Sequence, residues 1–252
     1  DLHLLSRRQR QMCIRDSYVC QSCTQPSESS ESMKQVIVMA LLFCIFLCEG
    51  CKEEDYVYPS VVTEFIGAQT NNDGTISQLV ADDGTIYSVL QRDGLGGLVA
   101  DTLYRTISIY EPITQENGKG NVAQLYSCQL VLSVNPLPAS DFKGNIKTDP
   151  VDIQSIWLSG EYLNMILLVQ YKELSHLYHF VDEGITSDQS GTQTLNLRLF
   201  HDRNNDYEAF TKQVYLSVPL KNYLQLLRKG DKIRFNLNTY KEGETYREFD
   251  YQ

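Results

Sequence analysis

The chain has 252 residues, of which 22 are Lys or Arg and 32 are Asp or Glu, and its net charge is −10 at pH 7. Contacts between Lys or Arg and phosphate supply most of the nonspecific affinity for nucleic acid, so this acidic balance argues against a nucleic-acid partner. A chain of this length can bury sufficient apolar cores without disulfides.

The first 32 residues have no pattern that could bury an apolar face. The stretch RRQRQMCIRDS at 7–17 looks like a translated sequencing adaptor, and QPSESSES follows it. We interpret residues 1–32 as a non-native leader and favour Met33 as the true start. Cys20 and Cys23 would suggest half of a zinc site or a redox pair, but with no second pair neither site is predicted.

A lipoprotein signal peptide is predicted at residues 33–50. Lys34 precedes twelve consecutive apolar residues, VIVMALLFCIFL at 36–47. A secretory apolar region has 7–15 residues after a basic start, whereas a spanning helix needs about 20. The run ends at Cys51 in an arrangement that resembles the lipobox of bacterial lipoproteins. The resemblance implies that Cys51 becomes the acylated N-terminus and holds the protein on the membrane.

An acidic spacer, residues 51–57, follows the predicted signal peptide. It begins with Cys51 and continues with the charged tetrad Lys52, Glu53, Glu54 and Asp55. This tetrad resembles the Lys-plus-acidic export signal that sends lipoproteins of the Bacteroidetes to the outer face of the outer membrane. The resemblance implies a lipid-anchored protein of the outer membrane that is exposed on the cell surface.

The cysteines predict no disulfide framework. Of the seven, Cys128 alone lies beyond the spacer. It sits in LYSCQLVLS, an apolar strand pattern, which indicates a small buried hydrophobic residue and not a nucleophile. Without the first 51 residues, which hold five basic and five acidic residues, the body keeps a charge of −10.

Residues 58–134 predict a small barrel of the OB kind. Short β-branched and aromatic runs alternate with turn dipeptides, of which Asp73-Gly74 and Asp83-Gly84 are typical of tight hairpins. Five strands within about eighty residues fit an antiparallel five-stranded barrel. The expected strands are VVTEFIGAQT, TISQLVA, TIYSVLQ, TLYRTISIYEPI and VAQLYSCQLVLS.

Residues 135–150, rich in Pro, predict a connector between two domains. Residues 151–252 then predict an antiparallel β-sandwich, because six runs alternate apolar with polar residues. One short helix is expected in LKNYLQLLRKGD at 220–231, where apolar residues share one face and Gly230 stops the helix. The predicted fold class is therefore all-β, an OB-like barrel followed by a sandwich with one short helix.

This arrangement resembles the NigD-like lipoproteins of the Bacteroidetes over residues 33–252. The resemblance is carried by the lipobox, the acidic spacer, the OB-like unit, DPVDIQSIWLSGEYLNMIL at 149–167 and PLKNYLQLLRKGDKIRFNLNTY at 219–240. It implies an N-terminal OB domain, a C-terminal β-sandwich and a self-immunity role proposed for a bacteriocin operon. It carries no catalytic motif.

Two residue patterns suggest metal sites, and both have simpler explanations. His176 and His179 are three apart, but such positions in an extended strand point to opposite faces, so strand-edge histidines are favoured over zinc. Asp202, Asn204 and Asp206 have the first spacings of a calcium loop. Tyr207 and Gln213 replace its turn glycine and bidentate glutamate, so a polar hairpin loop is favoured; no metal or cofactor is predicted.

The sequence favours a non-catalytic protein. It lacks the G-x-S-x-G, H-E-x-x-H and phosphate-loop patterns of common enzymes. The leading hypothesis is a surface lipoprotein that binds a partner at the envelope, such as a protein toxin in an immunity role. A glycan-binding or assembly accessory role is the alternative, since Trp157 and many tyrosines suit sugars or proteins, and a hydrolase with dispersed carboxylates is a third. Ligand-binding residues are not identified.

Overall fold

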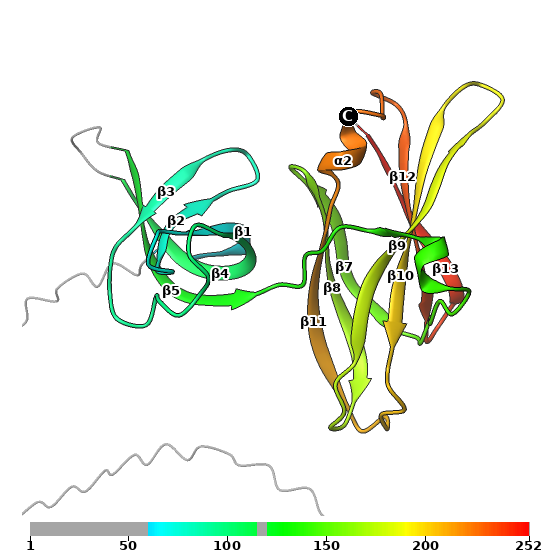
Figure 1. Cartoon of the computed structure of the whole chain (residues 1–252), viewed down its shortest axis with the longest axis horizontal. Helices are drawn as coiled ribbons and strands as arrows, with labels where there is room; N and C mark the ends of the chain where they lie inside the picture. The colour runs from blue at the N-terminus through cyan, green and yellow to red at the C-terminus, as the bar shows by residue number, and fades with distance from the viewer. Residues whose placement is uncertain (1–59, 115–119, 252) are drawn as a thin grey trace, which may run out of the picture. The chain divides into compact units, whose positions relative to one another are not determined.

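The computed structural model describes residues 60–114 and 120–251, which fall within one compact unit, Tyr58–Gln252. This part of the chain is nearly all β, as predicted (Figure 1). The predicted leader, the predicted signal peptide, Cys51 and the predicted export tetrad lie outside the described residues. Within the two described ranges, no helix is both long and apolar enough to cross a membrane.

The first five strands form the predicted barrel. They are β1 (Val62–Thr70), β2 (Ile76–Val80), β3 (Ile86–Val89), β4 (Leu103–Thr114) and β5 (Asn121–Leu130). The sheet closes on itself in the order β1-β2-β3-β5-β4, and β3 pairs parallel with β5 while the other pairs are antiparallel. Closure leaves no free strand edge in this unit.

Local turn chemistry explains the first two hairpins of the barrel. Gly74 has φ +79°, and a Cβ there would lie 2.1 Å from the carbonyl oxygen of Leu98, so only glycine fits. On these strands the side chains of Ile66, Leu79 and Leu125 point inward and are fully buried in the barrel core. Burying a side chain of this size contributes about 1.5–3 kcal/mol.

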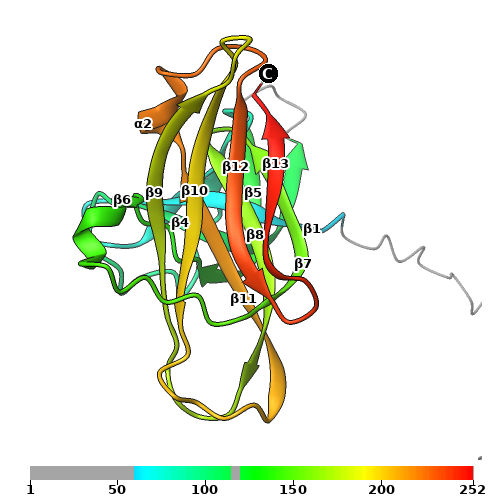
Figure 2. The same cartoon turned by 90° about the vertical axis from the view of Figure 1, so that its right-hand side faces the viewer.

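The remaining strands form the predicted sandwich. One sheet has the order β11-β8-β7 and the other β13-β12-β10-β9-β6 (Figure 2). The strands are β6 (Leu137–Pro138), β7 (Asp152–Ser159), β8 (Tyr162–Tyr171), β9 (Leu177–Ser187), β10 (Gln193–Asp202), β11 (Phe210–Pro219), β12 (Lys232–Thr239) and β13 (Gly243–Asp250). β10 and β12 pair parallel.

Three features of this half differ in detail from the sequence-based expectation. The predicted connector contains β6, which pairs with β9, and a 3-10 helix, η1 (Ala139–Phe142). The helix α2 covers Lys221–Leu224, after which the chain makes tight turns. A thirteenth strand, β13, was not expected, because its charged residues hide the strand alternation.

The sandwich core comes from alternate residues of facing strands. On β8, Leu163, Met165 and Leu167 are fully buried, and on β12 every second residue faces inward. Leu220 and Leu227 of the predicted helical stretch also join this core. The apolar face of that stretch is therefore real, although most of it is not helical.

A buried arginine connects the barrel to the sandwich. Arg105 of β4 makes a bidentate ion pair with Asp82 in the β2–β3 turn, where Nη2 lies 2.8 Å from Oδ2. The same guanidinium donates to Asn164 on β8 at 3.0 Å and to Ser217 on β11 at 3.2 Å. The Cζ atom of the guanidinium lies 4.0 Å from the centre of the Tyr162 ring. The barrel and the sandwich thus share one hydrogen-bonded centre around the Arg105 guanidinium.

Candidate binding site

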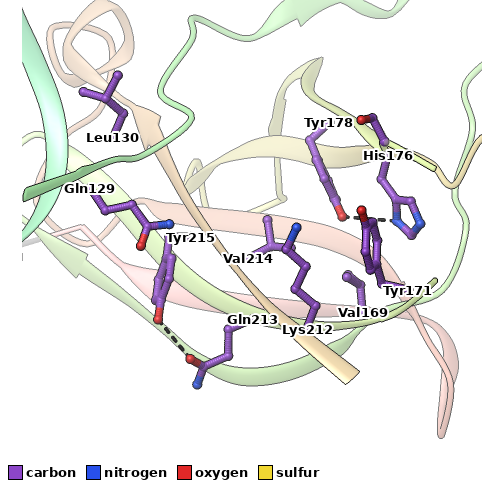
Figure 3. A pocket seen from close by; sticks show the side chains of 11 residues that line it. Gln129, Leu130, Val169, Tyr171, His176, Tyr178, Lys212, Gln213, Val214 and Tyr215 are labelled. Carbon is purple, nitrogen blue, oxygen red and sulfur yellow. Dashed lines mark hydrogen bonds between the residues drawn. The ribbon is translucent and has the colours of Figure 1, made fainter. Parts of the chain in front are cut away.

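A cavity of about 280 Å³ lies beside the N-terminal half of β11. Its walls come from the end of β5, from β8, from β9, from the β8–β9 loop and from β11 (Figure 3). The polar and aromatic side chains that face it include Tyr171, Tyr178, Lys212, Gln213 and Tyr215. Among the described residues that line it, none is Asp or Glu, so the cavity offers no paired carboxylates for hydrolysis.

The cavity lies against the edge of β11 and not against one face of its sheet. Four consecutive residues, Lys212–Tyr215, all line it. Successive side chains of a strand point to opposite faces, so a cavity over one face would touch only every second residue. β11 ends its three-stranded sheet, which leaves this side open.

A lysine and a tyrosine form the cationic wall of the cavity. The Nζ of Lys212 lies 4.4 Å from the centre of the Tyr171 ring, and that ring also packs against Phe210 at 5.4 Å. A cation over an aromatic face is attracted by the ring quadrupole. Figure 3 shows Lys212 and Tyr171 near Val169 and Val214, so the charge stands beside an apolar floor.

His176, which lines the cavity, pairs with the buried His201 of β10. Nδ1 of His201 lies 2.8 Å from the carbonyl oxygen of Asp149, which can only accept, so this nitrogen carries the proton. His201 Nε2 then accepts from Nδ1 of His176 at 3.0 Å, and the Tyr178 hydroxyl lies 3.3 Å from the same His176 nitrogen (Figure 3). Burial lowers the pKa of His201, although its bond to Asp149 acts in the opposite direction.

His176 and His179, whose spacing suggested a metal site, do not come together. His176 turns inward to His201, whereas His179 packs against the ring of Phe142 at 5.8 Å and accepts the N–H of Phe180. The expected strand-edge position is wrong for His176, which lies in the loop between β8 and β9 with a side chain only 3% exposed, whereas His179 lies within β9.

Asp206 has a structural role in the loop beside the cavity. Its carboxylate is buried and accepts the backbone N–H groups of Lys172 and Glu173, 2.8 and 3.2 Å away. Burial opposes its charge, but these backbone bonds outweigh burial and lower the pKa of Asp206. Nε2 of His176, which is buried and has no hydrogen-bond partner within the described part of the chain, lies 3.4 Å from Asp206 Oδ2.

The calcium spacing does not form a calcium loop. Asp202 accepts the N–H of Asn204 within a polar turn, and Asn204 and Asn205 have φ of 55° and 57°. Asp206 points instead to the loop after β8. Across residues 60–114 and 120–251, no group of three or more His, Cys, Asp or Glu side chains is arranged to hold a metal ion.

Two other residues from the sequence analysis lie away from the cavity. Trp157 on β7 packs edge-on against Phe65 of the barrel, with ring centres 5.3 Å apart. Cys128 is a free thiol, half-buried against the barrel core. These contacts are apolar packing, in which neither residue is offered to a ligand.

The sequence reasoning missed the cavity and its histidine pair. One pattern could have indicated His201, which continues the inward alternation of Leu195, Leu197 and Leu199 on β10. A histidine in that register must be buried and therefore needs a polar partner. No local pattern reveals that Lys212 stands over Tyr171, because these residues meet only through the pairing of β8 with β11.

Comparisons with known proteins agree with this architecture. Residues 133–251 match the family model of the NigD-like C-terminal β-sandwich domain. Among solved structures, the chain is 35% identical to a NigD-like immunity protein from Bacteroides caccae, with a TM-score of 0.63, covering 78% of this chain and 99% of that one. Among curated proteins, none matches the chain.

Two more distant structures share the fold. A protein of unknown function from Bacteroides vulgatus is 21% identical, with a TM-score of 0.60, covering 77% of this chain and 92% of its own. A candidate lipoprotein from Bacteroides fragilis is 12% identical, with a TM-score of 0.53, covering 77% and 99%. The identity and near-complete coverage of the Bacteroides caccae protein, together with the matched sandwich domain, mean that this chain belongs to the NigD-like family.

Proposed function

We propose that this protein is a non-catalytic, lipid-anchored binding protein of the outer cell surface that acts in bacteriocin immunity. The observation that carries the proposal is the cavity beside β11, which has aromatic and cationic walls and no carboxylate among the described residues that line it. The 35% identity to a NigD-like immunity protein supports the immunity role.

The chemistry of the cavity suits recognition. Tyr171 and Tyr178 offer large, rigid contact surfaces, and Lys212 adds a charge that stands over an aromatic ring. Hot spots of protein interfaces have this composition, an aromatic centre with few charged groups. Lipidation at Cys51 would hold the cavity close to the membrane where a toxin acts.

Survival of a deletion strain tests the function. The strain is exposed to the bacteriocin of a neighbouring producer and complemented with the parent gene, with Tyr171→Ala or with Tyr246→Ala. Tyr246 is a matched control, because Arg234 lies 4.5 Å from its ring on the other sheet, much as Lys212 lies over Tyr171.

We expect protection to fall with Tyr171→Ala and to persist with Tyr246→Ala. A deletion strain that is as resistant as its parent would remove the immunity role. Equal protection by both variants would show that the cavity has no part in immunity.

An oligosaccharide is the second candidate ligand, favoured by the tyrosines and the amides of Gln129 and Gln213 around the cavity. Flat ring faces pack on sugars while amides bond hydroxyl groups. Growth of the deletion strain on individual polysaccharides separates this role from immunity, since a sugar-binding protein predicts a growth defect on one glycan and unchanged bacteriocin sensitivity.

A further inference from the structure

The outer edge of β11 is only partly paired. In the three-stranded sheet β11-β8-β7, β11 bonds to β8 on one side alone. On the other side the chain runs parallel to it at Leu132, whose carbonyl accepts the N–H of Ser217 at 3.0 Å. Among the described residues, no other backbone segment bonds this edge. The half of β11 that precedes Leu216 therefore has an open edge.

The direction of the free backbone groups follows from the ladder. The β8–β11 register shows no bulge from Phe210 to Pro219. In an antiparallel pair, the backbone groups of alternate residues point toward the partner and away from it. Because the N–H of Ser217 points outward, the N–H groups of Thr211, Gln213 and Tyr215 also point outward. Thr211 and Gln213 thus present a donor and an acceptor each, about 7 Å apart.

This edge lacks most of the features that protect free strands. Exposed edges are usually blunted by charges, proline, bulges or covering segments. β13, at the end of the other sheet, carries Glu244, Arg247 and Glu248. The open part of β11 has one charge, Lys212, and its Nζ is drawn over the Tyr171 ring.

The surroundings of the edge also favour a guest strand. Residues 210–213 are all exposed, so the described part of the chain leaves much of their surface open to a partner. Phe210 is 52% exposed and Leu130, at the end of β5, is 50% exposed. The cavity lies along the same edge. A segment that formed backbone hydrogen bonds with this edge would extend the β-pairing that Leu132 makes with Leu216.

We propose that the open edge of β11 binds an extended segment of a partner polypeptide by strand addition. A polypeptide is the ligand whose donors and acceptors alternate at the spacing that Thr211 and Gln213 present. A guest of about five residues fills the open length. One of its side chains enters the apolar side of the cavity beside Val214 and Tyr178, and the next lies beside Gln129. This inference deepens the proposed function, because it names the partner class at the same cavity.

A single backbone change isolates strand addition from side-chain recognition. Gln213→Pro removes the outward N–H but leaves the ladder to β8, because that N–H does not point to β8, and edge positions tolerate proline. Gln213→Ala removes the same side chain and keeps the N–H, so it is the matched control. The full chain, purified in detergent, is used to select binders from a phage-displayed library of short random peptides.

We expect selected peptides to alternate apolar and polar residues. Fluorescence anisotropy should show that Gln213→Pro weakens their binding by roughly tenfold or more, whereas Gln213→Ala changes it by about twofold or less. A peptide with N-methyl groups on alternate amides should lose binding to the unchanged protein, which tests the inference even if Gln213→Pro does not fold.

Failure to select any peptide, equal effects of the two Gln213 variants, or full binding of peptides N-methylated in either alternation would overturn strand addition. The same variants in the bacteriocin assay separate this inference from the proposed function. Protection that is intact with Gln213→Pro contradicts strand addition and leaves immunity standing. If purified protein binds peptides with the expected pattern but deletion of the gene causes no bacteriocin sensitivity, strand addition is supported and the immunity role is contradicted.

Discussion

Removing Arg105 should destabilise the whole described unit. Its side chain is 3% exposed and that of its partner Asp82 is 11% exposed, so both charges are largely out of water. Arg105→Met leaves the Asp82 carboxylate without its cation and removes the bonds that Arg105 donates to Asn164 and Ser217, although Ser217 still donates to Asn164 at 2.7 Å. Breaking one partner of a buried pair costs about 3–5 kcal/mol of unfolding free energy.

Urea denaturation followed by tryptophan fluorescence measures this cost. Trp157 is the sole tryptophan of the chain and packs against Phe65 of the barrel, so it reports on the connection between barrel and sandwich. Arg198→Met is the matched control, because Arg198 bonds Glu183 at 2.6 Å but is 24% exposed. An ion pair this open contributes about 1 kcal/mol or less.

A double-mutant cycle with Asp82→Asn tests the mechanism. If the cost of Arg105→Met comes from an unpaired buried carboxylate, the double variant should lose less stability than the sum of the two single changes. Additive losses, or a loss below about 1 kcal/mol for Arg105→Met, would refute the view that this pair is buried and coupled.

The other predictions concern pH and the membrane anchor. Burial holds the pKa of His201 below its unfolded value of about 6.5, so the contribution of neutral His201 to stability is complete above that pH and is lost as the pH falls toward the folded pKa. Urea titrations should therefore show that stability declines less between pH 7 and pH 5 in His201→Gln than in the parent, and equal declines would contradict this reasoning. Cys51→Ala should release the protein from membranes, and persistent labelling by radioactive palmitate would contradict the anchor. Replacing 52–55 by alanines should keep lipidation but prevent surface display, and protease shaving of whole cells that removes parent and variant equally would contradict the export signal.

Local patterns in the sequence were sufficient for the class of fold and for all of its strands except β6 and β13. Asp83-Gly84 and Gly74 specify tight turns through backbone geometry that involves only neighbouring residues. The alternation on β12 identifies its buried face because side chains of a strand point to opposite sides. The five-stranded barrel and the sandwich were predicted correctly on these grounds.

The same local patterns gave wrong predictions for elements whose structure depends on packing against other segments of the chain. β13 has weak apolar alternation, and it forms because β12 offers a complete antiparallel edge. The stretch at 220–231 has a helical face, yet only Lys221–Leu224 is helical, since Leu227 is held in the sandwich core. Packing decides such segments because local preference differs by little between a turn and a short helix.

The candidate site was decided by tertiary structure alone. Tyr171 and His176 are close in the chain, but Lys212 and His201, the partner of His176, belong to later strands, so no local spacing rule connects the group. Their meeting depends on the register of β8 with β11 and on the stacking of two sheets. The sequence determined which residues can form strands and which faces they bury, because these properties are local. Only the folded chain decided which strand edge stays open, because an edge is free when no other segment pairs with it.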